Sequence, residues 1–163
     1  MTRNCDKSVK LRLQVNGEER EVEARADTAL LEVLRRDFGL ASVRDTCGIG
    51  VCGACTVLAD GEPVSACLLL APLAEGRAIT TVEGLGGDDP VQRAFVEAHA
   101  YQCAYCTPGM ILAVKRLLEE NPSPADEEIR LALSGNLCRC GSYLKILDAV
   151  RRAAAGQATK EAV

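Results

Sequence analysis

Apolar and polar side chains alternate through residues 9–15 and again through residues 19–25, the pattern of strands with one buried face. Asn16-Gly17 lies between the two runs, and this dipeptide favours a tight hairpin turn. A second, shorter hairpin is predicted around Asp60-Gly61, and one more strand follows it. The strands expected from these patterns are 9–15, 19–25, 56–59, 63–66 and 78–82.

The spacing of apolar residues changes to a helical period between the two hairpins. Leu30, Leu31, Leu34 and Phe38 recur on one helical face, and a glycine follows them at position 39. Asp27-Thr28 precedes this run and provides side chains suited to cap a helix start. Strand, strand, helix, loop and further strands predict a small α+β domain.

Apolar residues recur at helical spacing throughout the second half of the chain. The breaker-rich segment 84–90 separates it from the first half, which places two predicted units at 1–84 and 88–163. Ser123-Pro124 combines a capping residue with proline in the first helical position, and so predicts a helix start. Four short helices cannot bury their apolar faces singly, so we expect them to pack as a bundle. The expected helices are 90–100, 108–121, 124–133 and 143–155.

The composition and charge of the chain argue against some classes of function. The net charge is −4 and the basic residues are scattered, which argues against a nucleic-acid partner. No apolar run reaches the roughly 18–20 residues that a membrane span needs, and the alternating segment 11–15 stands where a signal peptide would be apolar. We therefore expect a soluble, cytoplasmic protein. In a reducing compartment, nine cysteines favour metal ligands over disulfides.

Eight of the nine cysteines fall into two groups, and Cys5 stands apart in the polar N-terminal segment as an incidental thiol. The first group has the spacing C-x4-C-x2-C followed by a more distant cysteine, which is the ligand spacing of plant-type [2Fe–2S] ferredoxins. Its glycines at 48, 50 and 53 allow the loop to wrap closely around a cluster. A structural zinc site is the alternative, although zinc sites usually present two short knuckles. The four residues are Cys47, Cys52, Cys55 and Cys67.

The second group combines C-x2-C with C-x-C, and each pair lies just before a predicted helix. Helix starts present unpaired N–H groups that favour thiolates and an anionic cluster. Spacing alone leaves zinc and a redox dithiol open as alternatives to iron. The four residues are Cys103, Cys106, Cys138 and Cys140.

Three segments together resemble the small iron–sulphur subunits of the molybdenum hydroxylases, a family that includes xanthine dehydrogenases and aerobic carbon monoxide dehydrogenase. They are DTCGIGVCGACTV (45–57), QCAYCTPGM (102–110) and LSGNLCRCGSY (133–143), in the order of the family. The resemblance extends over roughly 9–155. It implies a ferredoxin-like β-grasp domain followed by a four-helix bundle.

By the same resemblance the first cysteine group holds the ferredoxin-type cluster, and the second holds the cluster nearer the molybdopterin. Gln102 and Cys140 are then expected to lie near the pterin. Ala104 departs from the family pattern, which more often has glycine at this position, and the change is expected to crowd the loop.

The resemblance implies an electron relay that is not active alone. Its partners would be a large molybdopterin subunit and a medium FAD subunit, in a heterotrimer or its dimer. Two other hypotheses stay open at this point: a zinc-stabilised interaction module and a free two-cluster ferredoxin. Acid–base catalysis by the chain itself is not expected, since His99 is its single histidine and fits a surface or packing role.

Overall fold

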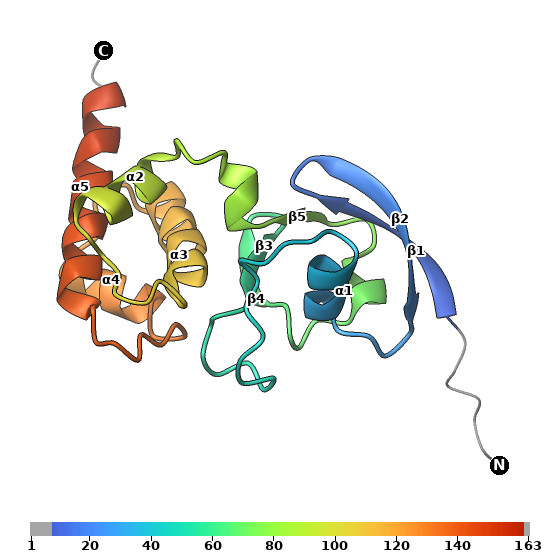
Figure 1. The fold of residues 1–163 in the computed structure, drawn as a ribbon. Coiled ribbons are helices and arrows are strands. Elements are labelled where there is room, and N and C mark those ends of the chain that lie inside the picture. The colour runs from blue at the N-terminus through green and yellow to red at the C-terminus, as the bar shows by residue number, and fades with distance from the viewer. Residues whose placement is uncertain (1–7, 162–163) are drawn as a thin grey trace.

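The computed structural model describes residues 8–161, so the predicted incidental thiol Cys5 lies outside the described residues. The fold is α+β, with a five-stranded mixed sheet and one helix in the first half and a helical bundle in the second (Figure 1). Both the predicted class and the predicted order of the two halves are confirmed.

The strands are β1 (Ser8–Val15), β2 (Glu18–Arg25), β3 (Thr56–Ala59), β4 (Glu62–Ser65) and β5 (Ala78–Thr80). The helices are α1 (Leu30–Arg36), α2 (Pro90–Glu97), α3 (Thr107–Glu120), α4 (Asp126–Ala132) and α5 (Tyr143–Glu161), with 3-10 turns η1 (Ala71–Ala74) and η2 (Val82–Leu85).

The sheet has the strand order β2-β1-β5-β3-β4. β1 and β2 form the predicted hairpin, with Asn16 and Gly17 both at positive φ in the turn. β5 pairs parallel to β1 and antiparallel to β3, which places it in the centre of the sheet. This arrangement, with α1 packed against the sheet, is the β-grasp architecture expected from the sequence.

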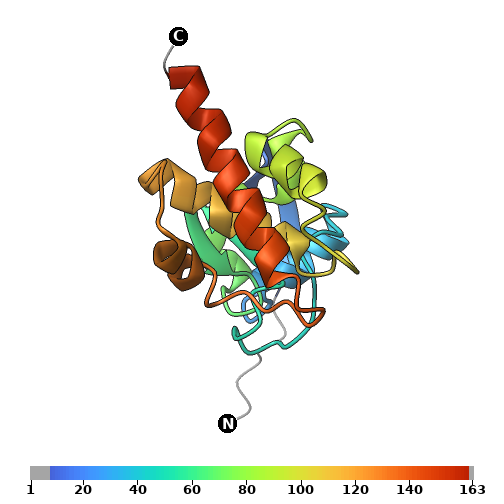
Figure 2. The ribbon, with the colours of Figure 1, turned by 90° about the vertical axis from the view of Figure 1, so that its left-hand side faces the viewer.

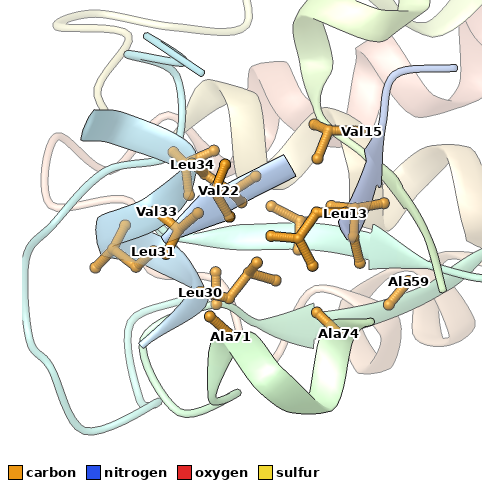
Figure 3. Packing of buried hydrophobic residues seen from close by; sticks show 14 of the residues in the cluster. Leu13, Val15, Val22, Leu30, Leu31, Val33, Leu34, Ala59, Ala71 and Ala74 are labelled. Carbon is orange, nitrogen blue, oxygen red and sulfur yellow. The ribbon is translucent and has the colours of Figure 1, made fainter. Parts of the chain in front are cut away.

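A first hydrophobic core lies between the sheet and α1 (Figure 3). Leu13 and Val15 contribute from β1, and Leu30 and Leu34 contribute from α1. All four side chains are at most 2% exposed, so they exclude water from one face of the sheet. The core thereby fixes the position of the long loop that connects α1 to β3.

The start of α1 differs from the prediction. Ala29 is the N-cap residue and no side chain caps the helix, whereas Asp27 or Thr28 was expected to do so. The hydroxyl of Thr28 instead accepts the N–H of Arg25 within the preceding turn. The first N–H groups of α1 donate to the carbonyl oxygens of Leu69 (2.7 Å) and Ala66 (3.0 Å). A distant segment therefore satisfies these donors, and the helix needs no local cap.

A second hydrophobic core holds α2, α3, α4 and α5 together, which confirms the predicted four-helix bundle. Figure 2 shows α5 crossing this bundle and extending beyond it. Phe95, Met110 and Ile146 are among its fully buried side chains. α4 begins later than predicted, because its N-cap is Ala125 rather than Ser123. The Glu128 carboxylate accepts the N–H of Ala125 at 2.6 Å and so supplies the cap from within the helix.

The two halves meet where α3 packs on β3 and β4. Arg116 on α3 forms an ion pair with Glu62 on β4, at 2.7 Å between nitrogen and oxygen. The division of the chain into domains at 1–84 and 88–163 stays a prediction. Within the stretch from residue 8 to 161, no helix combines the length and apolarity that crossing a membrane requires.

Candidate metal centres

Three cysteines of the first group, Cys47, Cys52 and Cys55, lie in the loop between α1 and β3, at the lower edge of the molecule in Figure 1. The N–H of Arg44 donates to the carbonyl of Ala54 at 3.2 Å and closes the base of the loop. Gly48, Gly50 and Gly53 all have positive φ, as their predicted role requires. The loop can therefore curl tightly enough for its N–H groups to point toward the sulphur atoms.

Cys67 reaches this loop from a separate segment of the chain. It follows β4, and the N–H of its neighbour Ala66 donates to the carbonyl of Cys55 at 3.3 Å. The carbonyl of Ala66 in turn accepts the N–H of Leu31 at the start of α1. The contact that replaces a cap on α1 thus also holds Cys67 beside Cys55.

The four thiols of the first group lie in two pairs. Cys47 contacts Cys52, and Cys55 contacts Cys67. The N–H of Ile49 points at the Cys47 sulphur and, with the Cys52 thiol and N–H, lowers the pKa of Cys47 to about 6. Burial raises the pKa of Cys55 to about 11. Cys55 is the buried thiol of this group, whereas Cys47, Cys52 and Cys67 are half-buried.

The second group comes together from two loops that are far apart in sequence. Cys103 and Cys106 precede α3, with Cys106 as its N-cap residue, and Cys138 and Cys140 precede α5. The sulphur atoms of Cys103 and Cys140 lie 3.4 Å apart, and Cys106 contacts Cys138. All four line one cavity of about 400 Å³, together with Cys52 of the first group.

The second group also combines acidic and weakly acidic thiols. The N–H of Tyr105, followed by the Cys140 thiol, lowers the pKa of Cys103. Burial, which acts against ionisation of Cys138, is outweighed by the Ser142 N–H and the Cys106 thiol, so the pKa of Cys138 is lowered. Burial and the Cys138 thiol raise the pKa of Cys106 to about 12. In the metal-free chain, burial therefore outweighs the helix start that was expected to favour a Cys106 thiolate.

Arrangement in pairs fits a binuclear cluster better than a single ion. In a [2Fe–2S] cluster each of two irons takes two thiolates, whereas a zinc ion draws four ligands to one point. Among residues 8–161, no three His, Cys, Asp or Glu side chains converge as the ligands of one metal ion would. Two pairs of thiols in each group, with N–H groups directed at the sulphurs, form a donor set suited to a [2Fe–2S] cluster.

The loops that carry the two groups are in direct contact. The N–H of Leu137 donates to the carbonyl of Cys52 at 2.9 Å. The side-chain amide of Asn136 donates to the carbonyl of Gly53 at 3.0 Å. Asn136 was not predicted as a site residue, because Gly135-Asn136 was interpreted only as the end of a helix. No local feature of the sequence distinguishes it from an ordinary asparagine after a helix.

Gln102 directly precedes Cys103 of the second group, and its expected place near a pterin stays a prediction. It is exposed and lines an open surface hollow of about 420 Å³ with Cys140 and Tyr101. Cys103 and Cys140 are the exposed cysteines among those described, so the second group reaches the surface at this hollow. His99 is exposed and has φ +47° just after α2, in agreement with the predicted surface role.

Models of two protein families match consecutive parts of the chain. Residues 13–80 match "2Fe-2S iron-sulfur cluster binding domain" and residues 81–151 match "[2Fe-2S] binding domain". Each match contains one complete cysteine group.

Relatives with known names match the chain over most of its length. The chain is 51% identical to the nicotinate dehydrogenase small FeS subunit of Eubacterium barkeri, over 89% of this chain and 94% of that protein. Quinoline 2-oxidoreductase from Pseudomonas putida 86 contains a chain with 40% identity and a TM-score of 0.88, and the match covers 94% and 97% of the two chains. Aldehyde oxidoreductase from Desulfovibrio desulfuricans has 41% identity and a TM-score of 0.87 over 92% of this chain, which equals 17% of that longer chain.

Proposed function

This chain belongs to the iron–sulphur small subunits of the molybdenum hydroxylases, and on that premise we propose which residues hold its clusters and which route its electrons take. The protein carries two [2Fe–2S] clusters and transfers electrons as a subunit of an oxidoreductase. Substrate oxidation takes place elsewhere in such a complex, so the chain supplies binding, spacing and tuning of potential.

The first cluster is held by Cys47 and Cys52 on one iron and by Cys55 and Cys67 on the other. The observation that supports this assignment is the contact within each pair of thiols. The buried Cys55 anchors the cluster in the fold. Cys47 receives N–H groups of the glycine-rich loop, which stabilise the additional negative charge of the reduced state.

The second cluster is held in the same way, by Cys103 with Cys140 and by Cys106 with Cys138. The cavity that these residues line accommodates the inorganic core between the starts of α3 and α5. Gln102 contacts the pterin of a neighbouring subunit, because it shares an open surface hollow with the exposed ligand Cys140. Electrons enter at this hollow and pass through the second cluster to the first.

The partners are a large molybdopterin subunit and a medium FAD subunit, in a heterotrimer or its dimer. Exposed apolar side chains next to each cysteine group support docking on both sides. Ile49, Val51 and Leu68 flank the first group, and Leu137 and Leu144 flank the second, all of them more than half exposed. A reducing cytoplasm belongs to the same proposal, since cluster assembly needs free thiols.

Removal of single thiols tests the ligand assignment. Cys55→Ser is expected to remove the first cluster, and Cys106→Ser the second, so that each variant retains about half of the roughly four irons that two binuclear clusters contain. Cys5→Ser is the matched control and is expected to retain all of them. Iron and acid-labile sulphide are measured after anaerobic purification. Full iron content in either ligand variant would refute the assignment of that residue.

A further inference from the structure

The carbonyl of Gly53 lies at the point where the two cysteine-bearing loops meet. It accepts the N–H of Thr56 at 3.2 Å and the hydroxyl of Thr56 at 2.8 Å, both from its own half of the chain. It also accepts the side-chain amide of Asn136 at 3.0 Å, from a residue 83 positions later. Gly53 follows Cys52 directly, and Asn136 precedes Cys138 by two residues. The bond therefore joins the immediate neighbourhoods of one ligand in each group.

Asn136 is buried, with 7% of its surface exposed. A primary amide buried without partners is destabilising, so a buried asparagine has a strongly determined position. Its nitrogen also lies 3.3 Å from the hydroxyl of Thr56, which makes a second partner from the opposite loop. Both contacts of this amide reach across to the first half of the chain.

The backbone segments around this contact leave no room for a Cβ atom at two glycines. A Cβ atom on Gly53 would lie 2.4 Å from both the Asn136 amide nitrogen and the Gly135 carbonyl oxygen. A Cβ atom on Gly109, near the start of α3, would lie 2.3 Å from the Gly53 carbonyl oxygen. At Gly53 and Gly109 there is therefore no room for a side chain, and the two loops approach each other here through backbone and the Asn136 amide.

Two consecutive residues of one loop bind two consecutive carbonyls of the other. Leu137 binds the carbonyl of Cys52 through its backbone N–H, and Asn136 binds that of Gly53 through its side chain. The first of these hydrogen bonds connects a ligand of one cluster to the residue before a ligand of the other. The second is the side-chain bond that holds the first in register, and it can be removed by mutation.

We propose that Asn136 is a positioning residue for electron transfer between the two clusters, holding the Cys52–Gly53 segment against the Leu137–Cys138 segment. The proposal rests on the assignment of clusters to the two cysteine groups. Without the amide, the loops separate and the distance between the clusters becomes larger and less uniform, although each group keeps its own four thiols. Transfer between the clusters then slows while each cluster remains bound.

Electron paramagnetic resonance of the fully reduced chain measures this separation without any enzymatic turnover. Each reduced cluster carries one unpaired electron, and the magnetic interaction between the two splits their lines by an amount that falls with the cube of the distance. The samples are the full-length chain and its variants Asn136→Ala and Asn136→Asp, where the aspartate has a similar size but lacks the N–H donor. Asn121→Ala is the control, because Asn121 also makes two hydrogen bonds in a loop of the helical half, to Ser123 and Glu128, away from both groups.

The expected result is a loss of the splitting in both Asn136 variants, with iron content unchanged and with the wild-type splitting retained in Asn121→Ala. Unchanged splitting in both Asn136 variants would overturn the inference and leave the cluster assignment intact. Loss of iron from both variants, or an equal effect of Asn121→Ala, would also overturn it, since Asn136 would then serve retention or general stability. A wild-type chain without iron would instead contradict the proposed function itself.

Discussion

The phenol of Tyr105 donates a hydrogen bond to the backbone carbonyl of Asp45, at 3.0 Å between the oxygen atoms. Tyr105 lies between the first two cysteines of the second group, and Asp45 precedes the first cysteine of the first group by two residues. The guanidinium of Arg44 lies over the same ring, 5.2 Å from its centroid. The two loops are therefore in contact at a solvent-exposed position, through Tyr105, as well as in the interior, through Asn136.

Removal of this phenol tests the contact through Tyr105. Tyr105→Phe keeps the ring under Arg44 and removes only the hydrogen bond, so the free energy of unfolding should fall by about 0.5–1 kcal/mol, as for a solvent-exposed bond. Tyr101→Phe, at an exposed tyrosine of the same segment, is the control and should change stability by less. Denaturant unfolding followed by circular dichroism measures both. Equal stability of the two variants would show that the Asp45 contact contributes nothing.

The backbone at Ala104 provides a second test. Ala104 has φ +59°, a left-handed conformation that costs an alanine about 1 kcal/mol relative to glycine. A glycine, which the family resemblance leads us to expect here, would adopt this conformation without that cost. Ala104→Gly should raise the free energy of unfolding by about 0.5 kcal/mol, after the added flexibility of the unfolded chain is allowed for.

Gly48 follows the first cysteine of the first group, as Ala104 follows the first cysteine of the second. Gly48→Ala is therefore the reverse of Ala104→Gly. It has φ +66°, and a Cβ there would contact nothing within 4 Å. Gly48→Ala should therefore lower stability through backbone strain alone, by about 1 kcal/mol. If both substitutions destabilised the protein, the strain argument would be wrong.

The pH dependence of stability should contain a contribution from Glu83. Burial raises the pKa of this carboxyl, but donors from Ser42 and Thr81 outweigh it, and the pKa in the folded chain is below its ordinary value. A lowered folded pKa stabilises the fold at pH values above the unfolded pKa, near 4.3, and this stabilisation is lost as the pH falls through the folded pKa.

Wild type should exceed Glu83→Gln in stability by about 0.5–1 kcal/mol at pH 7, with the difference shrinking below about pH 4. Unfolding at a series of pH values measures this, and Glu97→Gln at an exposed position controls for the change in net charge. A difference that stayed constant from pH 7 to pH 3 would show that the carboxylate is not responsible.

The thiols of iron-free protein that keeps its fold should differ in reactivity. Because the N–H of Ile49 lowers the pKa of Cys47 to about 6, this residue should be alkylated first at pH 7, and more slowly below pH 6. Cys106, with its pKa raised to about 12 by burial, should react last. Peptide mass spectrometry after brief iodoacetamide treatment gives the order. The same order in urea-unfolded protein would mean that the fold does not cause it.

Spacing and periodicity predicted the two cysteine groups, the glycine-rich loop and the helices that precede or follow each group. These features are local, so the residues that determine them are neighbours in the sequence. The cap of α1 was predicted wrongly for the opposite reason. The N–H groups of Leu30 and Leu31 are satisfied by carbonyls near Cys67, and no local pattern indicates such a distant partner.

The contact between the two cysteine groups was likewise not predictable from the sequence. Gly109 stands in an ordinary-looking helix start, and only the structure places the Gly53 carbonyl where its side chain would be. Likewise, spacing defines a set of four cysteines but does not tell which sulphur lies beside which. The pairs Cys103–Cys140 and Cys106–Cys138 connect loops more than thirty residues apart, so they depend on how the helices pack.

The central claim is that both cysteine groups hold a binuclear iron cluster. Metal and sulphide analysis of the anaerobically purified chain, combined with electron paramagnetic resonance after dithionite reduction, tests it most directly. We expect about four irons per chain and two distinct [2Fe–2S] signals. Zinc in place of iron, or a single cluster signal with about two irons per chain, would contradict the account.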